Sequence, residues 1–270
     1  MPRHHPFPTL TVPLVGMVHL PALPGAPDHE GGMEPVLSWV RQEVAALRDA
    51  GFDGVMVENY GDTPFHPESV PAETVAALTL AVHVAIETAN GLPVGVNVLR
   101  NDARAALGIA AATGARFVRV NVHAGTMWTD QGPLVGRAHE TLRVRSTLGT
   151  STALLTDVHV KHATPPAGSD IASAATDLWE RAHSDGVIVS GSGTGARTDP
   201  DRVARVRTAV PDAPLWVGSG ATPESIAELL SAGADGFIVG SWIQREGRAG
   251  RGVDPQRAAA FVEAVRSRGG

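Results

Sequence analysis

The sequence predicts an α/β protein that folds as a (β/α)8, or TIM, barrel. Three observations support this prediction: a length of 270 residues, eight short β-branched runs, and longer amphipathic stretches between them. About 250 residues are typical of such a barrel, and regular alternation of strand and helix indicates a parallel sheet. An open, doubly wound sheet is the alternative, because eight strands can also remain open. We expect residues 1–270 to form one domain, with 1–12 as an N-terminal extension.

The expected elements follow one another as eight strand–helix units. The strands are Leu14–His19, Gly54–Glu58, Val94–Leu99, Phe117–His123, Ala153–Lys161, Gly186–Ser190, Leu215–Gly218 and Gly236–Ser241. The helices are expected at 34–50, 71–90, 102–113, 134–148, 169–184, 199–209, 222–232 and 254–268. Glycines at 51, 114 and 233 mark helix ends. A capping residue followed by proline marks helix starts at Asp199-Pro200 and Thr222-Pro223.

Composition and charge exclude several classes of protein. The formal net charge is −6, so we expect no basic surface for nucleic acid. The chain has no cysteine, which excludes disulfides and thiolate metal sites. Residues Met1–Pro6 lack the apolar stretch of a signal peptide, and we find no run of about 18 apolar residues that predicts a membrane-spanning helix. We therefore expect a cytoplasmic protein without membrane insertion.

Polar side chains gather at the expected carboxyl ends of the strands, where the active sites of such barrels form. Arg119, Asn121 and His123 alternate with valines on the fourth strand, and we expect them to share one face. Asp157, His159 and Lys161 repeat this pattern on the fifth strand. A hydrogen-bonded role in the core is the alternative for each residue. The candidate catalytic residues are Lys161, Asp157, Glu58, His19, His123, His159, Asn97 and Asn121.

Lys161 is the only lysine among 22 lysine and arginine residues. Unlike arginine, a buried lysine can lose its proton and form a Schiff base. In a first mechanism, the Lys161 amine attacks a keto or aldehyde substrate while Asp157 or Glu58 moves protons. A lysine left by chance at the rim of a loop is the alternative.

A second mechanism uses a divalent metal, because imidazole and carboxylate suit zinc, manganese or iron. The candidate metal ligands are His19, Glu58, His123, Asp157 and His159. Alternate residues on one strand face lie roughly 6.6 Å apart. Asp157 and His159 can therefore share a metal only if their side chains converge.

Glycine-rich turns follow the sixth, seventh and eighth expected strands. Small residues let backbone N–H groups approach an anion, and barrels of this kind often bind phosphate after strands 7 and 8. The candidate phosphate-binding residues are Ser190, Gly191, Ser192, Gly193, Gly218, Ser219, Gly220, Gly240 and Ser241. The run from Gly191 to Gly195 lacks the spacing and acidic partner of a dinucleotide-binding fingerprint. The expected partner is a small phosphorylated metabolite.

Two long loops predict lids over the site, and one apolar helix predicts an interface between subunits. The long loops Gly61–Pro71 and Ala124–Pro133 are expected to act as lids, since loops of this length are usually functional or mobile. The helix expected at 71–90 is apolar around more of its circumference than one contact with a barrel requires. We therefore expect a homo-oligomer. A thick barrel–helix interface, or cover from the tail Pro2–Pro13, is the alternative.

Several of these segments resemble the BtpA family. The most specific is Val15–Gly25, which reads Gly-Met-Val-His-Leu-Pro-Ala-Leu-Pro-Gly from its second residue. Asp53–Asn59, Asp157–His162, Ser190–Gly195 and Gly218–Thr222 also fit, and the resemblance extends from Val12 to the last expected helix. It implies a ribulose-phosphate-binding type of barrel.

The resemblance leaves two classes of function open. The leading one is an enzyme acting on a small phosphorylated sugar or phosphoriboside, with lyase, isomerase or hydrolase chemistry. The family is named for a factor needed to accumulate photosystem I. The rival is therefore a non-catalytic biogenesis or stability factor for a photosynthetic or other membrane protein complex.

Overall fold

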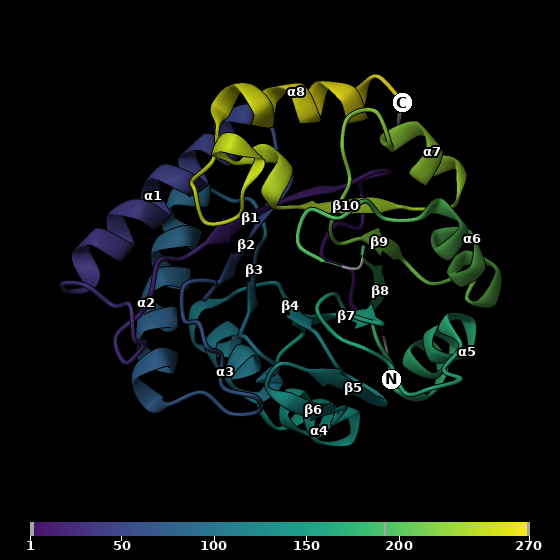
Figure 1. Ribbon diagram of the computed structural model, residues 1–270. Coiled ribbons are helices and arrows are strands. Elements are labelled where there is room, and N and C mark those ends of the chain that lie inside the picture. Colours follow the sequence, from purple (N-terminus) through teal and green to yellow (C-terminus); the bar gives the residue numbers. More distant parts are fainter. Residues whose placement is uncertain (1–2, 192, 269–270) are drawn as a thin grey trace.

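The computed structural model describes residues 3–191 and 193–268, and eight parallel strands in it close into a barrel (Figure 1). Pairing of β1 with β10, in which Leu14 lies opposite Phe237, closes the ring. The predicted barrel is confirmed, and the open sheet is excluded. The barrel strands are β1 (Leu14–His19), β2 (Gly54–Glu58), β3 (Val94–Asn97), β4 (Phe117–Val120), β7 (Ala153–Val158), β8 (Gly186–Val189), β9 (Leu215–Val217) and β10 (Gly236–Val239).

Helices surround this barrel on the outside (Figure 1). They are α1 (Met33–Ala50), α2 (Ala72–Ala89), α3 (Ala103–Thr113), α4 (Ala138–Thr147), α5 (Ile171–Thr176), α6 (Pro200–Ala209), α7 (Ile226–Ser231) and α8 (Pro255–Arg266). A π-helical turn, η1 (Asp177–Arg181), continues α5, and the 3-10 helices η2 (Ser241–Ile243) and η3 (Arg245–Gly247) follow β10. Asp199 caps α6 ahead of a proline in the first turn, as predicted, and Asp254 caps α8 in the same way. The helix start predicted at Thr222-Pro223 is wrong, because residues 223–225 form a turn and α7 begins only at Ile226.

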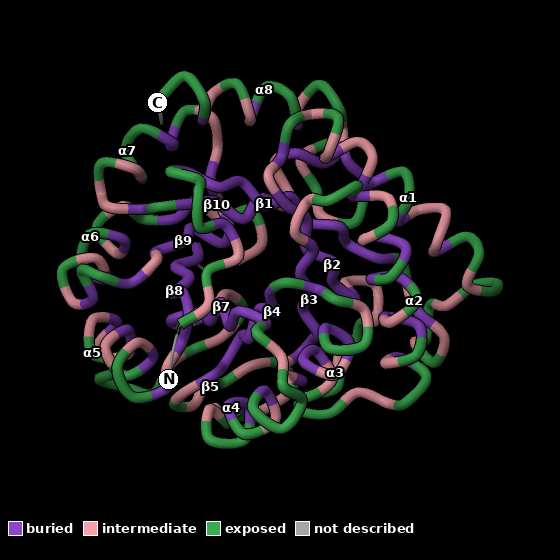
Figure 2. Tube along the Cα trace, turned by 180° about the vertical axis from the view of Figure 1, so that it is seen from behind, coloured by how far each residue is buried: buried purple, intermediate pink, exposed green. Residues whose placement is uncertain are grey.

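The barrel interior forms a core of its own. The N-terminal tail closes it at the end where the strands begin. Phe7 packs with its ring centroid 5.7 Å from those of both Phe117 and Trp216. Gly95 leaves the space that the Phe117 ring fills, since a Cβ there would lie 2.2 Å from the ring. A second core fills the space between strands and helices, so the strands are buried on both faces while the outer helix surfaces are exposed (Figure 2).

The region between β4 and α4 differs from the expectation. Thr126–Thr129 (β5) and Gly132–Val135 (β6) form an antiparallel hairpin, where the sequence predicted a loop and then a helix from residue 134. Leu134 pairs with Met127 across the hairpin, so its apolar side chain belongs to a strand and not to the first turn of a helix. The helix therefore begins only at Ala138.

The prediction that no apolar stretch is long enough to cross a membrane is wrong for helix α2. Its length and mean hydropathy of 1.3 meet that criterion by composition alone. Its residues Leu78, Ala81 and Val82 are buried in the core between strands and helices. Core helices of globular proteins meet the same criterion, so the composition of α2 carries no argument for a membrane.

Candidate active site

A cavity of about 580 Å³ opens at the carboxyl ends of the barrel strands. We call it the mouth cavity. Glu58, Asn121 and Lys161 line its floor, and segments that follow β1, β2, β3, β7 and β10 form its walls. Its size lies within the range of about 300–1,000 Å³ that small-molecule sites occupy. It lies at the end of the barrel where active sites of this fold form.

Glu58 and His19 stand at the centre of a first polar network on one side of the mouth cavity. Asn97 donates to Glu58 Oε2 at 2.6 Å, and His19 Nε2 lies 3.6 Å from Glu58 Oε1. On the other ring edge, Gln244 Nε2 lies 2.7 Å from His19 Nδ1. The four side chains come from β1, β2, β3 and the segment after β10, which the closed barrel brings together.

The orientation of Gln244 assigns the tautomer of His19. The backbone N–H of Arg251 donates to Gln244 Oε1 at 3.1 Å, so the amide must present its NH2 group to the imidazole. His19 Nδ1 then accepts, and the proton of the neutral ring lies on Nε2, directed at Glu58.

Burial decides the charge of His19. It lowers the pKa of His19 to about 4, and the positive charges of Lys161 and Arg119 add to this effect, whereas Glu58 and Gln244 oppose it. Burial alone raises the pKa of Glu58, but the positive charges of Lys161 and Arg119, together with the hydrogen bond from Asn97, hold it below its usual value. At neutral pH the pair is therefore a neutral imidazole beside a carboxylate.

Asp157 is the centre of a second polar network, on β4, β7 and β8. Arg119 binds it through two hydrogen bonds, from Nε at 2.8 Å and from Nη2 at 2.7 Å. Asn121 donates to Asp157 Oδ2 and Ser190 donates to Asp157 Oδ1, each at 3.2 Å. Although burial opposes the charge of Arg119, its contacts with Asp157 raise the pKa of the guanidinium. Both oxygens of Asp157 are thus fully engaged.

Lys161 lies between these two networks. Burial lowers the pKa of its amine, Glu58 and Asp157 raise it, and the nearby Arg119 and Arg100 lower it, with a net shift below 10.5. A lysine that loses its proton more readily than usual is a nucleophile for carbonyl carbon. The site therefore combines an amine with the buried carboxylate of Glu58.

Three residues of this site were not predicted from the sequence. Arg100 follows β3 and donates to the backbone oxygen of Lys161 at 2.8 Å. Tyr60 follows β2 and packs its ring 4.6 Å from that of His19. Both lie within a few residues of a strand end, so extending the same rule past the last strand residue would have found them. Gln244 has no such signal, because it lies five residues beyond β10.

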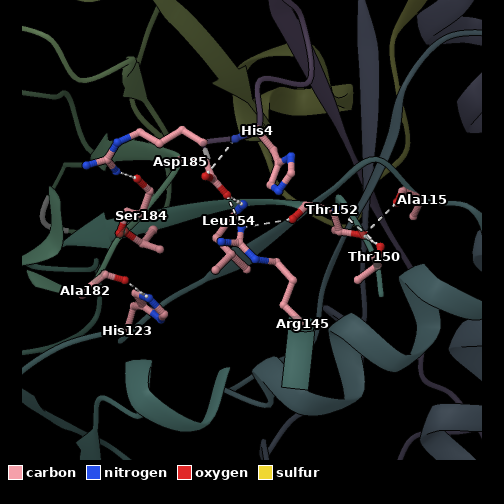
Figure 3. A network of polar contacts seen from close by, with 12 residues as sticks. His4, Ala115, His123, Arg145, Thr150, Thr152, Leu154, Ala182, Ser184 and Asp185 are labelled. Atoms are coloured by element: carbon pink, nitrogen blue, oxygen red, sulfur yellow. Dashed lines mark hydrogen bonds and ion pairs between the residues drawn. The ribbon is translucent and has the colours of Figure 1, made fainter. Parts of the chain in front are cut away.

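His123 and His159 lie outside the mouth cavity, and the strand faces predicted for them are wrong. Strand β4 ends at Val120, and His123 Nε2 lies 3.0 Å from the carbonyl oxygen of Ala182, near the network around Asp185 (Figure 3). Strand β7 ends at Val158, and His159 has a φ of +50°, which breaks the alternation before Lys161. His159 instead lies 2.9 Å from the hydroxyl of Ser169 and lines a separate cavity beside the β5–β6 hairpin.

The candidate metal ligands do not gather. Among residues 3–191 and 193–268, no group of three or more histidine, aspartate or glutamate side chains is arranged to hold a metal ion. His19 and Glu58 are neighbours, whereas Asp157 is engaged by Arg119 and the other two histidines point elsewhere. The five ligands proposed from the sequence therefore do not form one metal centre in this arrangement.

The candidate phosphate-binding residues divide into two groups. Gly220, Gly240 and Ser241 line a cavity of about 150 Å³ next to the mouth cavity, with Thr222 and Arg257. We call it the turn cavity. Gly220 has φ +72°, and a Cβ there would lie 1.8 Å from the Ala196 carbonyl oxygen, so only glycine fits.

The second group serves other contacts. Ser190 binds Asp157, the Ser219 carbonyl accepts from Thr198, and Gly218 lies against Ile188. Gly191 lies against Ala196, and Gly193 lies beside His162. Ser192 lies outside the described residues.

The two expected lids differ in how they meet the mouth cavity. In Gly61–Pro71, Thr63 and Phe65 line the cavity, and a Cβ on Gly61 would lie 2.4 Å from the Ala22 nitrogen, so this loop packs against the one after β1. The second segment contains β5 and carries Trp128, which is 56% exposed. Their action as lids remains a prediction.

The sequence is similar to proteins of one family. The sequence model of the BtpA family matches residues 10–267. The Photosystem I biogenesis protein BtpA of Synechocystis sp. is 42% identical over 253 residues, which cover 94% of this chain and 88% of that protein. An uncharacterized protein of Thermococcus kodakarensis is 45% identical over 251 residues, covering 93% of this chain and 94% of that one.

Solved structures share the fold at low sequence identity. The structure described as native KDPGal superimposes with a TM-score of 0.62 and 18% identity, covering 96% of this chain and 97% of that one. The N-(5'-phosphoribosyl)anthranilate isomerase of Pyrococcus furiosus superimposes with a TM-score of 0.59 and 14% identity, covering 95% and 99%. At these identities the likeness extends to the barrel fold alone.

Proposed function

This chain belongs to the BtpA family, and on that premise we propose that it is an enzyme acting on a small phosphorylated sugar or phosphoriboside. One observation carries the proposal. A lysine amine with a lowered pKa lies beside two buried carboxylates at the floor of an open cavity, at the catalytic end of a barrel. The names of the two structural neighbours fit this substrate class but concern those proteins.

In the proposed chemistry the Lys161 amine attacks a substrate carbonyl carbon. A carbinolamine forms and loses water, which leaves a protonated Schiff base as electron sink for cleavage or isomerisation next to it. Glu58 is the better proton carrier, because its Oε1 faces only the His19 ring while both oxygens of Asp157 are held by Arg119. Asp157 and Arg119 would then hold the floor of the site in place.

The substrate phosphate would rest in the turn cavity. Ser241 and Gly240 follow β10, Gly220 follows β9, and the Arg257 guanidinium supplies positive charge over the Trp242 ring at 4.6 Å. The two cavities lie on the same two segments of the chain. Thr194 lines the mouth cavity and its neighbour Gly195 lines the turn cavity, while Gly250 and Gly247, after β10, line the mouth and turn cavities respectively. The proposal requires that one small molecule extend from the mouth cavity into the turn cavity.

Calorimetry with sugar phosphates tests the phosphate assignment. We expect Ser241→Glu to abolish binding, because a carboxylate would occupy the turn cavity and repel the phosphate. Thr208→Glu adds the same charge on the exposed side of α6 and serves as the matched control. Equal binding by the wild type and Ser241→Glu would remove the phosphate from this cavity.

Borohydride trapping tests the lysine chemistry. With candidate phosphorylated carbonyl compounds, mass spectrometry should find the reduced adduct on Lys161, the only lysine of the chain, and none on Lys161→Arg. If a substrate binds and turns over but no adduct forms, Lys161 acts as an electrostatic clamp.

The rival function is a non-catalytic biogenesis factor, the role that its name gives to the Synechocystis relative. Such a role would require a partner surface but no intact pocket. The open mouth cavity, with its charged floor, supports the enzyme instead.

Three further expectations remain part of this proposal. They are a single domain across residues 1–270, a cytoplasmic location and a homo-oligomer. Leu80 on α2 is 49% exposed, which is consistent with a covered apolar face in an assembly. Light scattering should then give at least twice the chain mass of 28.0 kDa, and a clean monomer would contradict the oligomer.

A further inference from the structure

Arg100 is a buried cation without a carboxylate partner. It is 5% exposed and lines the mouth cavity. Its one described side-chain hydrogen bond runs from Nη2 to the backbone oxygen of Lys161 at 2.8 Å. Within residues 3–191 and 193–268, no carboxylate lies within ion-pair distance of its guanidinium. A guanidinium has five N–H donors, so most of its planar fork is left for a partner in the cavity that Arg100 lines.

The two other buried arginines show what this position lacks. Arg119 is 2% exposed and binds Asp157 through two hydrogen bonds, and Arg145 is 5% exposed and binds Asp185. A buried charge is costly unless it is paired. The chain meets this requirement at both of these arginines and leaves it unmet at Arg100.

Nearby carboxylates cannot serve Arg100, because they are already engaged. Asp157 is held by Arg119, and Glu58 accepts from Asn97 and faces His19. Asp130 also raises the pKa of Arg100, but it is exposed and accepts from the Gln131 side chain. At the floor of the mouth cavity, Arg100 and Lys161 meet one lining carboxylate, Glu58, and the buried pair of Arg119 and Asp157 adds one charge of each sign. At the rim Asp28 and Arg251 offset one another, so the cavity remains one negative charge short.

We propose that Arg100 binds a carboxylate of the substrate, beside the carbonyl carbon that Lys161 attacks, so that the substrates are phosphorylated oxo acids or sugar acids. The planar guanidinium fork matches the two oxygens of a carboxylate. Arg100 binds the backbone oxygen of Lys161 and both residues line the mouth cavity, so an anion on this fork would share the cavity with the amine. This inference rests on the proposed function, because it assigns the phosphate of the same molecule to the turn cavity.

Binding of three small probes tests the assignment. 3-Phosphoglycerate and glycerol 3-phosphate share a three-carbon skeleton and a phosphate, and only the first has a carboxylate. Glycerate has the carboxylate without the phosphate. We expect wild-type protein to bind 3-phosphoglycerate at least about tenfold more tightly than glycerol 3-phosphate in calorimetry. Arg100→Gln should bind the two equally, with the affinity for glycerol 3-phosphate unchanged.

Arg251→Gln is the matched control, since it removes one positive charge from the exposed rim of the same cavity. It should retain the preference for 3-phosphoglycerate. Arg100→Lys keeps the charge but not the fork and should retain only part of the preference. If Arg100→Gln does not fold, the wild-type ratio and Arg100→Lys decide the matter.

The outcomes separate this inference from the proposed function. Equal binding of both phosphates by the wild type, or a preference that survives in Arg100→Gln, overturns the role of Arg100 and leaves the proposed function standing. Glycerate binding that depends on Arg100, without binding of either phosphate, refutes the phosphorylated substrate and keeps the carboxylate site. Failure of all three probes to bind the wild type contradicts both.

Discussion

Two buried charge clusters lie at opposite ends of the barrel, and they are built differently. At the amino-terminal end, Asp185 accepts from Arg145, from the backbone of Leu154 at 2.8 Å and from the backbone of His4 at 3.0 Å (Figure 3). Arg145 and the Leu154 backbone share Asp185 Oδ2, and the His4 backbone engages Oδ1. At the carboxyl-terminal end, three cations meet two carboxylates.

The difference separates stability from binding. The cluster of Asp185 and Arg145, which we call the base cluster, is complete without any other molecule. Its contacts hold the start of β7 and β8 and the N-terminal tail together. The charged groups Arg100, Arg119, Lys161, Glu58 and Asp157, which we call the mouth cluster, carry one more positive than negative charge beside an open cavity. An anion from outside would complete them. Sites that bind or react often keep such unfavourable arrangements at a cost in stability.

Breaking the base cluster should give the largest effect. We expect Arg145→Met to lower the free energy of unfolding by about 3–5 kcal/mol, because it leaves the buried carboxylate of Asp185 without its cation. Urea unfolding measures this change. Arg41→Met removes an exposed partner of Glu34 and should change little. A small effect of Arg145→Met would show that the base cluster is not a structural element.

Lowering the pH should destabilise the protein through one buried histidine in each region. Burial lowers the pKa of both His19, in the mouth, and His123, beside the base cluster, to about 4. Above pH 6.5 both are neutral in the folded and unfolded chain. As the pH falls from 6.5 towards 4, the unfolded chain gains protons that the folded protein cannot, so stability is lost in that window, by about 3 kcal/mol per histidine.

Urea unfolding at about pH 7 and about pH 4.5 measures this loss. His19→Gln and His123→Gln should each make the pH dependence shallower by about 2–3 kcal/mol. A variant with the same pH dependence as the wild type would mean that its histidine is protonated in the folded state at low pH without penalty.

Removing a cation of the mouth cluster should change the free energy of unfolding least, and in the opposite direction to a substitution in the base cluster. We expect Lys161→Met to leave the unliganded protein equally stable or more stable by up to about 1 kcal/mol, because it removes the excess positive charge. Thermal unfolding without and with 3-phosphoglycerate provides the measurement. A loss as large as that of Arg145→Met would contradict the distinction between the two regions.

Much of the fold was predictable from local pattern. β-Branched runs placed all eight barrel strands, and glycines such as Gly51 and Gly114, with φ of +93° and +86°, marked helix ends. The β5–β6 hairpin was not predictable in this way. Its four-residue strands contain Gly132 and Pro133, which read as loop, while Leu134 and Val135 read as the start of a helix.

The site was predictable only as far as the strand periodicity holds. His19, Glu58, Asn97, Asn121 and Asp157 lie where alternation places them, and Lys161 reaches the same cavity from beyond its strand. His123 and His159 were misplaced because a sequence does not show that β4 and β7 stop early. Gln244 could not be found, since its contact with His19 spans 225 residues and arises only when the barrel closes.

The pKa of the single lysine tests the central claim most directly. With lysine labelled by ¹³C at Cε, NMR should show one side-chain resonance, which Lys161→Arg removes. We expect it to titrate below the ordinary value of 10.5, and we expect 3-phosphoglycerate to raise this pKa, because an anion on Arg100 offsets the excess positive charge. Titration at 10.5 that 3-phosphoglycerate does not change would contradict an activated amine in an anion-binding mouth.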